Sequence, residues 1–235
     1  MQNNFGSIIS VNDPASYSIE VAEIIIEKIK NVLSKKQNCA VALSGGNTPI
    51  PIFELLGTIY LNALTWQKVH FFWIDERCVA PTHAESNYGK AYEYFLCKIK
   101  NVTIYRIPAE KNPDAAASEY EEQLISYFYG TPKFDLGILG MGDDGHVASI
   151  FPKSEIQKEK NKFVAAEYIQ KLNSFRISLT YPVLNNIKTR IFLLNGESKK
   201  ILFNKLFLEN NSYSAHEYPI LGLFPNKNEN IFIIS

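Results

Sequence analysis

Short apolar stretches alternate with longer amphipathic stretches along most of the chain. The apolar runs are typical of buried strands and occur at residues 6–11, 39–43, 69–74, 102–107, 134–139, 190–194 and 230–235. In the longer stretches, apolar residues recur at every third or fourth position, which predicts helices at residues 15–36, 88–98, 113–129 and 201–209. Residues 163–168 and 175–180 are also expected to be extended.

Helix starts are marked in the sequence as well. Asp13 and Asn112 each precede a proline, and an Asp or Asn before a proline is a typical helix N-cap. Strands and helices alternate without a repeat or a low-complexity linker. We therefore predict an α/β fold with a mainly parallel central sheet and helices on both of its faces. We interpret residues 1–235 as a single domain.

One predicted strand ends in a glycine-rich loop, residues 140–146, that also carries ionisable side chains. Its glycines are Gly140, Gly142 and Gly145, and its last residues include Asp144 and His146. Glycine lets the backbone turn tightly and approach a ligand closely, and open α/β sheets bind ligands at the carboxyl ends of their strands. The loop is a candidate catalytic site. The alternative is a turn whose Asp side chains cap their own backbone and whose His is solvated.

A second loop, residues 44–48, follows the strand predicted at residues 39–43. It consists of Ser44, Gly45, Gly46, Asn47 and Thr48, and Pro49 then opens a helix. Backbone N–H groups at a helix start, together with two hydroxyls, form a favourable site for a phosphate. The loop is neither a P-loop nor a dinucleotide fingerprint, and an ordinary strand-to-helix turn is the alternative.

A third strand end carries charged side chains. The aromatic run at residues 69–74 is followed by Asp75, Glu76 and Arg77, again at a carboxyl edge. His70 lies inside that run and is expected to be a core or face residue rather than a catalyst.

The charge balance narrows the classes of partner. The chain contains 24 Lys and Arg residues and 24 Asp and Glu residues, so no global field favours nucleic acid or an anionic membrane. No apolar run approaches the roughly 20 residues needed to span a bilayer. Three scattered cysteines without metal-ligand spacing predict free thiols in a reducing compartment. We expect a cytoplasmic protein. The sequence does not predict an oligomeric state.

Three stretches resemble a known family when they are taken together. They are Leu-Ser-Gly-Gly-Asn-Thr-Pro at 43–49, Asp-Glu-Arg at 75–77 with Ser-Asn at 86–87, and Gly-Met-Gly-Asp-Asp-Gly-His-Val-Ala-Ser-Ile-Phe-Pro at 140–152. They are similar, in order and spacing, to motifs of the 6-phosphogluconolactonases and the related glucosamine-6-phosphate isomerase/deaminases. The resemblance runs nearly end to end. It implies hydrolysis of 6-phosphoglucono-1,5-lactone to 6-phosphogluconate, the second step of the oxidative pentose phosphate pathway, without a metal or an organic cofactor.

The resemblance also assigns a phosphate site. Residues 44–48 match the phosphate loop of the family, and Arg77 matches a basic residue near the substrate phosphate. Arg176 and Lys199 match phosphate-binding positions of the wider superfamily. A phosphate in a protein without net charge needs loop amides and fixed cations, which agrees with this set. The alternatives are an exposed sheet residue for Arg176 and a solvated charge at a helix start for Lys199.

For the chemistry we assign His146 as the general base. A lactone carbonyl is already electrophilic, so its hydrolysis requires an activated water and a stabilised oxyanion, and an imidazole accepts a proton from water near neutral pH. Asp144 and Asp75 are the candidates for orienting the ring or the water, and spacing alone does not decide between them. The amides of Gly140, Gly142 and Gly145 are candidate oxyanion donors.

Two other functions remain as alternatives. In the isomerase/deaminases the His loop continues with a Glu that supports the catalytic His, whereas Phe151 stands at that position here. The missing carboxylate favours the lactonase branch. A non-catalytic sugar-phosphate sensor on the same fold is the second alternative, although such a protein is expected to lose the His or its carboxylates.

Overall fold

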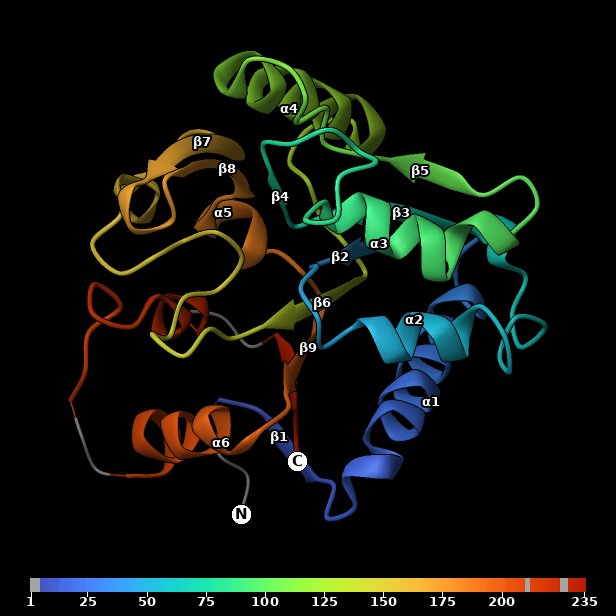
Figure 1. Ribbon diagram of the computed structural model, residues 1–235. Coiled ribbons are helices and arrows are strands. Elements are labelled where there is room, and N and C mark those ends of the chain that lie inside the picture. Colours follow the sequence, from blue (N-terminus) through green and yellow to red (C-terminus); the bar gives the residue numbers. More distant parts are fainter. Residues whose placement is uncertain (1–4, 210–211, 225–227) are drawn as a thin grey trace.

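A parallel sheet forms the centre of the computed structural model, which describes residues 5–209, 212–224 and 228–235. Its strand order within these ranges is β1-β10-β9-β6-β2-β3-β5, and all neighbouring strands run parallel (Figure 1). The strands are β1 (Ser7–Ser10), β2 (Cys39–Leu43), β3 (Val69–Trp73), β5 (Thr103–Tyr105), β6 (Leu136–Gly140), β9 (Thr189–Leu194) and β10 (Glu229–Ile234). The predicted α/β class and its mainly parallel sheet are confirmed.

Helices connect the strands. They are α1 (Pro14–Leu33), α2 (Ile50–Leu56), α3 (Asn87–Tyr94), α4 (Pro113–Phe128), α5 (Tyr181–Leu184) and α6 (Glu197–Phe203). The predicted N-caps are confirmed, since Asp13 accepts from the N–H of Ala15 and Asn112 accepts from the N–H groups of Asp114 and Ala115.

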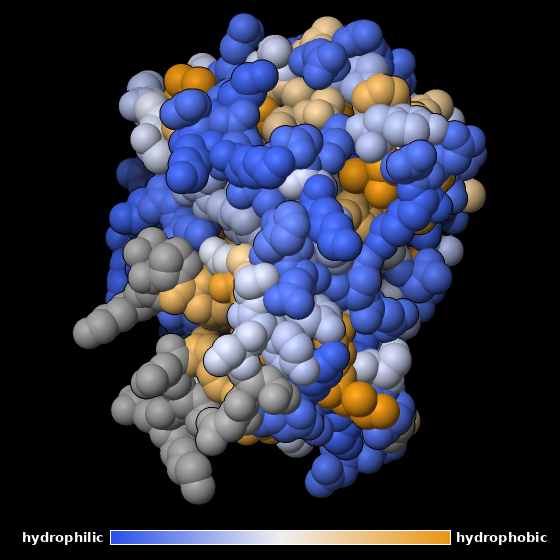
Figure 2. All heavy atoms as spheres, turned by 90° about the vertical axis from the view of Figure 1, so that its left-hand side faces the viewer, coloured by the Kyte–Doolittle hydropathy of each residue, from blue (hydrophilic) through white to orange (hydrophobic). Residues whose placement is uncertain are grey.

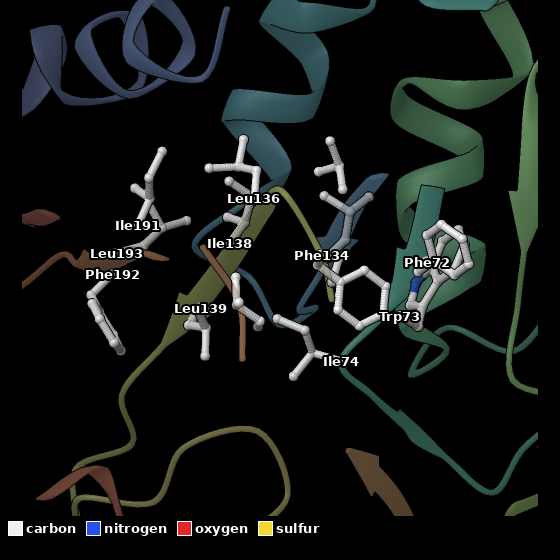
Figure 3. Close-up of a cluster of buried hydrophobic side chains, with 14 of the residues drawn as sticks. Phe72, Trp73, Ile74, Phe134, Leu136, Ile138, Leu139, Ile191, Phe192 and Leu193 are labelled. Atoms are coloured by element: carbon white, nitrogen blue, oxygen red, sulfur yellow. The ribbon is translucent and has the colours of Figure 1, made fainter. Parts of the chain in front are cut away.

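Side-chain alternation along the strands gives the sheet two apolar faces. Val41 and Leu43 of β2 and Ile138 of β6 pack under α1 and α2 on one face. On the other face, Phe72 of β3 meets Phe128 of α4 in a tilted ring contact at 5.8 Å between centroids. Figure 3 shows the central part of this core around β3, β6 and β9. Strands buried on both faces read as nearly continuous apolar runs, which is why the sequence revealed them.

A second, smaller sheet contains the two segments predicted to be extended at residues 163–168 and 175–180, but the sequence analysis did not predict that they form a sheet of their own. It is antiparallel, with the order β4-β8-β7, and consists of β4 (Asp75–Arg77), β7 (Val164–Ile169) and β8 (Ser174–Leu179). The residues of β4 were expected to be only the charged end of the preceding strand. They form a separate strand because β8, about a hundred positions further along the chain, supplies the hydrogen-bonding partner.

Two helix boundaries also differ from those predicted. The helix expected at 88–98 ends as α3 at Tyr94 and continues as a 3₁₀ turn at Leu96–Lys98. The helix expected at 201–209 begins earlier, as α6 at Glu197, and passes into a π-helical turn at Asn204–Leu208.

The face seen in Figure 2 is largely hydrophilic, with hydrophobic patches scattered between polar side chains. None of the helices in the described ranges is long and apolar enough to cross a membrane.

Candidate active site

A cleft of about 460 Å³ opens at the carboxyl edge of the parallel sheet. It lies beside the neighbouring strands β2 and β6, where the strand order reverses: β3 and β5 follow on one side of β2, and β6, β9 and β10 follow on the other. The loops that leave β2 and β6 therefore diverge, and open α/β sheets bind ligands at such a switch point. Both loops line the cleft, together with residues of β4, β8 and α6.

The 44–48 loop forms one wall of the cleft. The N–H of Ser44 donates to the carbonyl of Ile138 in β6 at 2.9 Å, which fixes the loop to the neighbouring strand. Among the described residues the buried Ser44 hydroxyl has no hydrogen-bond partner, so it is available to a ligand. The ammonium of Lys90 donates to Asn47 Oδ1 at 3.1 Å, a contact that sequence reasoning missed because no motif surrounds Lys90.

Two arginines face each other beside this loop. Arg77 of β4 and Arg176 of β8 are directly opposite in the antiparallel register, and both line the cleft. The pKa of Arg176 is lowered, first by burial and second by the positive charge of Arg77. Like charges directly opposite in a sheet are unfavourable, so the pair favours an anion between or beside the two guanidinium groups.

Backbone anchors hold this cationic wall in place. The buried carboxylate of Glu76 accepts from the N–H groups of Arg77 at 2.8 Å, Asn87 at 2.7 Å and Tyr88 at 2.8 Å. Burial raises the pKa of Glu76, and these three N–H donors oppose that effect. Glu76 thus ties β4 to the start of α3, a role that the sequence analysis did not assign.

Lys199 reaches the cleft from the first turn of α6. Burial lowers the pKa of Lys199, whereas the negative charge of Asp143 acts in the opposite direction. Asp143 also accepts from the Ser198 hydroxyl at 3.0 Å, which connects the start of α6 to the 140–146 loop. All of the basic residues predicted from the sequence, Arg77, Arg176 and Lys199, therefore line one cleft.

His146 also lines the cleft, and its ring contacts Asp144. Asp144 Oδ1 accepts from the backbone N–H of His146 at 3.1 Å and lies 2.6 Å from Nδ1 of its ring. Burial raises the pKa of Asp144, but the bonds from His146 and Lys171 outweigh that effect and hold it below its ordinary value. An ionised carboxylate only accepts hydrogen bonds, so Nδ1 carries the proton and Nε2 is left with the lone pair.

Asp75 has different partners. Its Oδ2 accepts from the Ser149 hydroxyl at 2.6 Å, and its Oδ1 accepts from the Asn87 amide at 3.3 Å. Of the two candidate carboxylates, Asp144 is the one that contacts His146, while Asp75 organises Ser149 and Asn87. These two residues also line the cleft and were not assigned a role from the sequence. Both residues belong to the motifs at 86–87 and 140–152, and this membership could have identified them as candidate site residues.

The glycines of the 140–146 loop shape its backbone. The N–H of Gly142 donates to the carbonyl of His146 at 2.9 Å, and the N–H of Gly145 donates to the carbonyl of Gly142 at 2.9 Å. Gly145 has a φ of +75°, a value that favours glycine. Each of these two amides thus has an acceptor within the loop, and donation from Gly140, Gly142 or Gly145 to an oxyanion stays a prediction.

His70 lies outside the cleft. His70 is half-buried and bonds through Nδ1 to the Tyr127 hydroxyl at 2.7 Å, as expected for a face residue. Across the described ranges, no group of three or more His, Cys, Asp or Glu side chains is placed to hold a metal ion.

Fold and cleft together define an α/β protein with a polar, cation-lined ligand site at the switch point of a parallel sheet. The chain belongs to the glucosamine-6-phosphate isomerase/6-phosphogluconolactonase family, whose model matches residues 12–232.

Similar proteins of this family are named as 6-phosphogluconolactonases. A 6-phosphogluconolactonase of Nostoc sp. is 33% identical over 79% of this chain and 78% of its own length. A probable 6-phosphogluconolactonase of Arabidopsis thaliana is 39% identical over 72% of this chain and 71% of its own length. The solved structure of the Trypanosoma cruzi 6-phosphogluconolactonase superimposes with a TM-score of 0.88, at 27% identity over 99% of this chain and 95% of that chain. The Thermotoga maritima enzyme gives a TM-score of 0.82, at 28% identity over 97% and 99% of the two chains.

Proposed function

We propose that this protein hydrolyses 6-phospho-D-glucono-1,5-lactone to 6-phospho-D-gluconate, the second step of the oxidative pentose phosphate pathway. The observation that carries the proposal is that one cleft is lined both by His146, whose ring contacts Asp144, and by a set of cations suited to a phosphate. Its relatives named as 6-phosphogluconolactonases support the same reaction.

The phosphate group of the substrate binds at the cationic wall. Arg77 and Arg176 supply guanidinium groups that match phosphate oxygens, and the 44–48 loop contributes hydroxyl groups, including that of Ser44. Lys199, which also lines the cleft, adds an ammonium. A bound dianion compensates the like charges of the two arginines. With the phosphate held there, the sugar ring is positioned with its lactone toward His146.

His146 then acts as the general base. Its Nε2 takes a proton from water while the water oxygen bonds to C1 of the lactone, and Asp144 stabilises the imidazolium that forms. The tetrahedral intermediate collapses with cleavage of the bond between C1 and the ring oxygen. The ring oxygen leaves with the proton from the imidazolium, which returns His146 to its neutral form. The product carboxylic acid then loses its proton to solvent.

Phe151 argues against the isomerase/deaminase reaction. Its ring lies 4.4 Å from that of His146, centroid to centroid, where the isomerase/deaminase pattern has a Glu supporting the catalytic His. A phenyl ring supplies an apolar contact and no proton acceptor. The function best supported by the cleft is therefore hydrolysis.

A coupled assay tests this proposal. Freshly generated 6-phosphogluconolactone is offered to the protein, product formation is measured with 6-phosphogluconate dehydrogenase, and spontaneous opening is subtracted. Glucosamine 6-phosphate is assayed in parallel for ammonia release. Lactone turnover without ammonia is expected. Ammonia without lactone turnover overturns the proposal in favour of the isomerase branch, and binding of 6-phosphogluconate without either activity supports a sensor.

A further inference from the structure

Lys171 lies at the tip of the hairpin that joins β7 to β8. It is in the 3₁₀ turn Gln170–Leu172, which precedes Asn173 in the left-handed region at a φ of +47°. About half of its side chain is exposed, at 51%, yet the residue lines the cleft. No motif in the sequence marks this position.

The ammonium of Lys171 completes a ring of four contacting side chains that includes His146. It pairs with Asp144 Oδ2 and lies 4.5 Å from the centroid of the Phe151 ring. Phe151 in turn packs on the ring of His146, and His146 bonds to Oδ1 of Asp144. Each of the four side chains thus contacts two others.

This arrangement divides the Asp144 carboxylate between two partners. Oδ1 faces the imidazole and Oδ2 faces the ammonium, so the ion pair fixes the rotation of the carboxylate that Nδ1 of His146 requires. The ion pair also compensates charge. An uncompensated carboxylate beside an imidazole favours the imidazolium form, which cannot accept a proton.

Other charged groups share the cleft. They are Asp75 and Arg77 of β4, Glu85, Asp143, Arg176 of β8 and Lys199 of α6. Among the described residues, however, Lys171 is the cation that bonds to Asp144. Its effect on His146 is therefore the most direct of the set.

We propose that Lys171 is a positioning residue, which orients Asp144 toward His146 and compensates the negative charge of that carboxylate beside the imidazole. The inference rests on the proposed function of His146 as general base. A surface ion pair of the ordinary kind contributes little to any property, so the alternative is that Lys171 has no such role.

Variants of Lys171 separate these possibilities. Lys171→Met removes the charge but keeps the stem, and Lys171→Arg keeps the charge. Lys158→Met is the matched control, since it removes an exposed ion pair of the same type, the one with Glu155 at 2.7 Å. The pH profile of kcat/KM for the lactone is measured for all of them, together with the titration of the His146 ring by NMR, assigned with a His146→Gln variant.

In Lys171→Met, the acid limb of the profile is expected to move to higher pH by about 0.5–1 unit, as expected for one charge lost at several ångströms in a partly exposed site. The NMR midpoint of His146 moves with it, KM changes less than about twofold, and Lys171→Arg restores the wild-type profile. Lys158→Met leaves both curves in place.

Three results would contradict this inference or its basis. Lys171→Met curves that superimpose on those of Lys158→Met show a surface ion pair only. A large rise in KM with an unmoved acid limb makes Lys171 a substrate contact rather than a positioning residue. An NMR midpoint that moves while the rate profile does not upholds the effect of Lys171 on His146 and instead refutes His146 as the base.

Discussion

The imidazole of His146 packs directly on the backbone of Gly142. A Cβ atom at position 142 would overlap Nδ1 and Cε1 of that ring. The same two residues are joined by the hydrogen bond from the N–H of Gly142 to the carbonyl of His146, at 2.9 Å. The absence of a side chain at one position therefore fixes where the proposed base lies.

Gly142→Ala tests this contact. The methyl group displaces the imidazole, and kcat is expected to fall about 100-fold, the cost of a misplacement of roughly 1 Å, while the melting temperature changes little. Gly140→Ala is the comparison, because a Cβ there meets no atom within 4 Å. Any loss in that variant should appear in KM, since Gly140 lines the cleft. An equal fall of kcat in both would contradict the explanation.

Asp144→Asn tests the tautomer of His146. An amide that donates to Nδ1 moves the ring proton to Nε2, so the ring no longer accepts a proton from water. We expect kcat to fall by roughly 10²–10⁴ with little change in KM. Asp143→Asn, one residue earlier, keeps its bond with Ser198 and should retain most of the activity. Normal turnover of Asp144→Asn would remove the Asp144–His146 pair from the mechanism.

Removing one of the two facing arginines is expected to weaken ligand binding without lowering the stability of the fold. Arg176→Met removes a charge-assisted contact to the phosphate, so the Kd for 6-phosphogluconate should rise about 10- to 100-fold. It also relieves the like-charge pairing with Arg77, so the melting temperature without ligand should not fall. Calorimetric titration and thermal melts with and without 6-phosphogluconate measure both. A lower melting temperature with unchanged affinity would make Arg176 a structural residue.

Proton uptake should accompany binding of a phosphorylated ligand in alkaline solution, as the pH approaches the ordinary pKa of a lysine. Burial lowers the pKa of Lys199 below its ordinary value, and a phosphate dianion beside the ammonium raises it again. Titration calorimetry of 6-phosphogluconate in buffers of different ionisation enthalpy gives the number of protons taken up. Lys199→Gln should abolish the uptake. Equal uptake in that variant would assign the proton to another group.

Asp144 should add no ionisation of its own to the acid side of the pH–rate profile. Because the pKa of Asp144 is held below its ordinary range, its carboxylate stays ionised wherever a free Asp carboxyl is ionised. The same lowered pKa means that Asp144 stabilises the fold above its unfolded-state value of about 4, and that this contribution is lost as the pH falls further. Asp144→Asn should flatten the acid side of the stability curve.

Much of the site could be predicted because its parts follow apolar strands. The loops after β2 and β6 each stand at the end of a buried run, and the alternation of strands and helices was enough for the parallel sheet. In the second sheet, β7 and β8 were also predicted as extended segments, but β4 gave no such signal. β4 is only three residues long and consists of charged side chains, so no periodicity identifies it. Its pairing with β8 depends on a contact between distant segments.

The residues that sequence reasoning missed share this property. Lys90 meets Asn47, and Lys171 meets Asp144, only through the folded arrangement of separate elements. The orientation of His146 was left open for the same reason. The sequence offered two candidate carboxylates, those of Asp75 and Asp144. Only the structure shows that the carboxylate of Asp75 accepts a hydrogen bond from Ser149 instead of contacting His146.

The β4–β8 ladder also connects ligand binding to the unfolding of the chain. Arg77 and Arg176 lie opposite each other only while this short ladder is intact. A phosphate bound by both arginines therefore stabilises the pairing of two segments that are remote in the sequence. Three residues of pairing are a weak element by themselves, and weak elements open before the core does. A bound sugar phosphate should therefore slow amide hydrogen exchange in β4 and β8 well before it affects β2 or β6. In the empty protein, the edge that carries the arginines is expected to be the first part of the cleft to open.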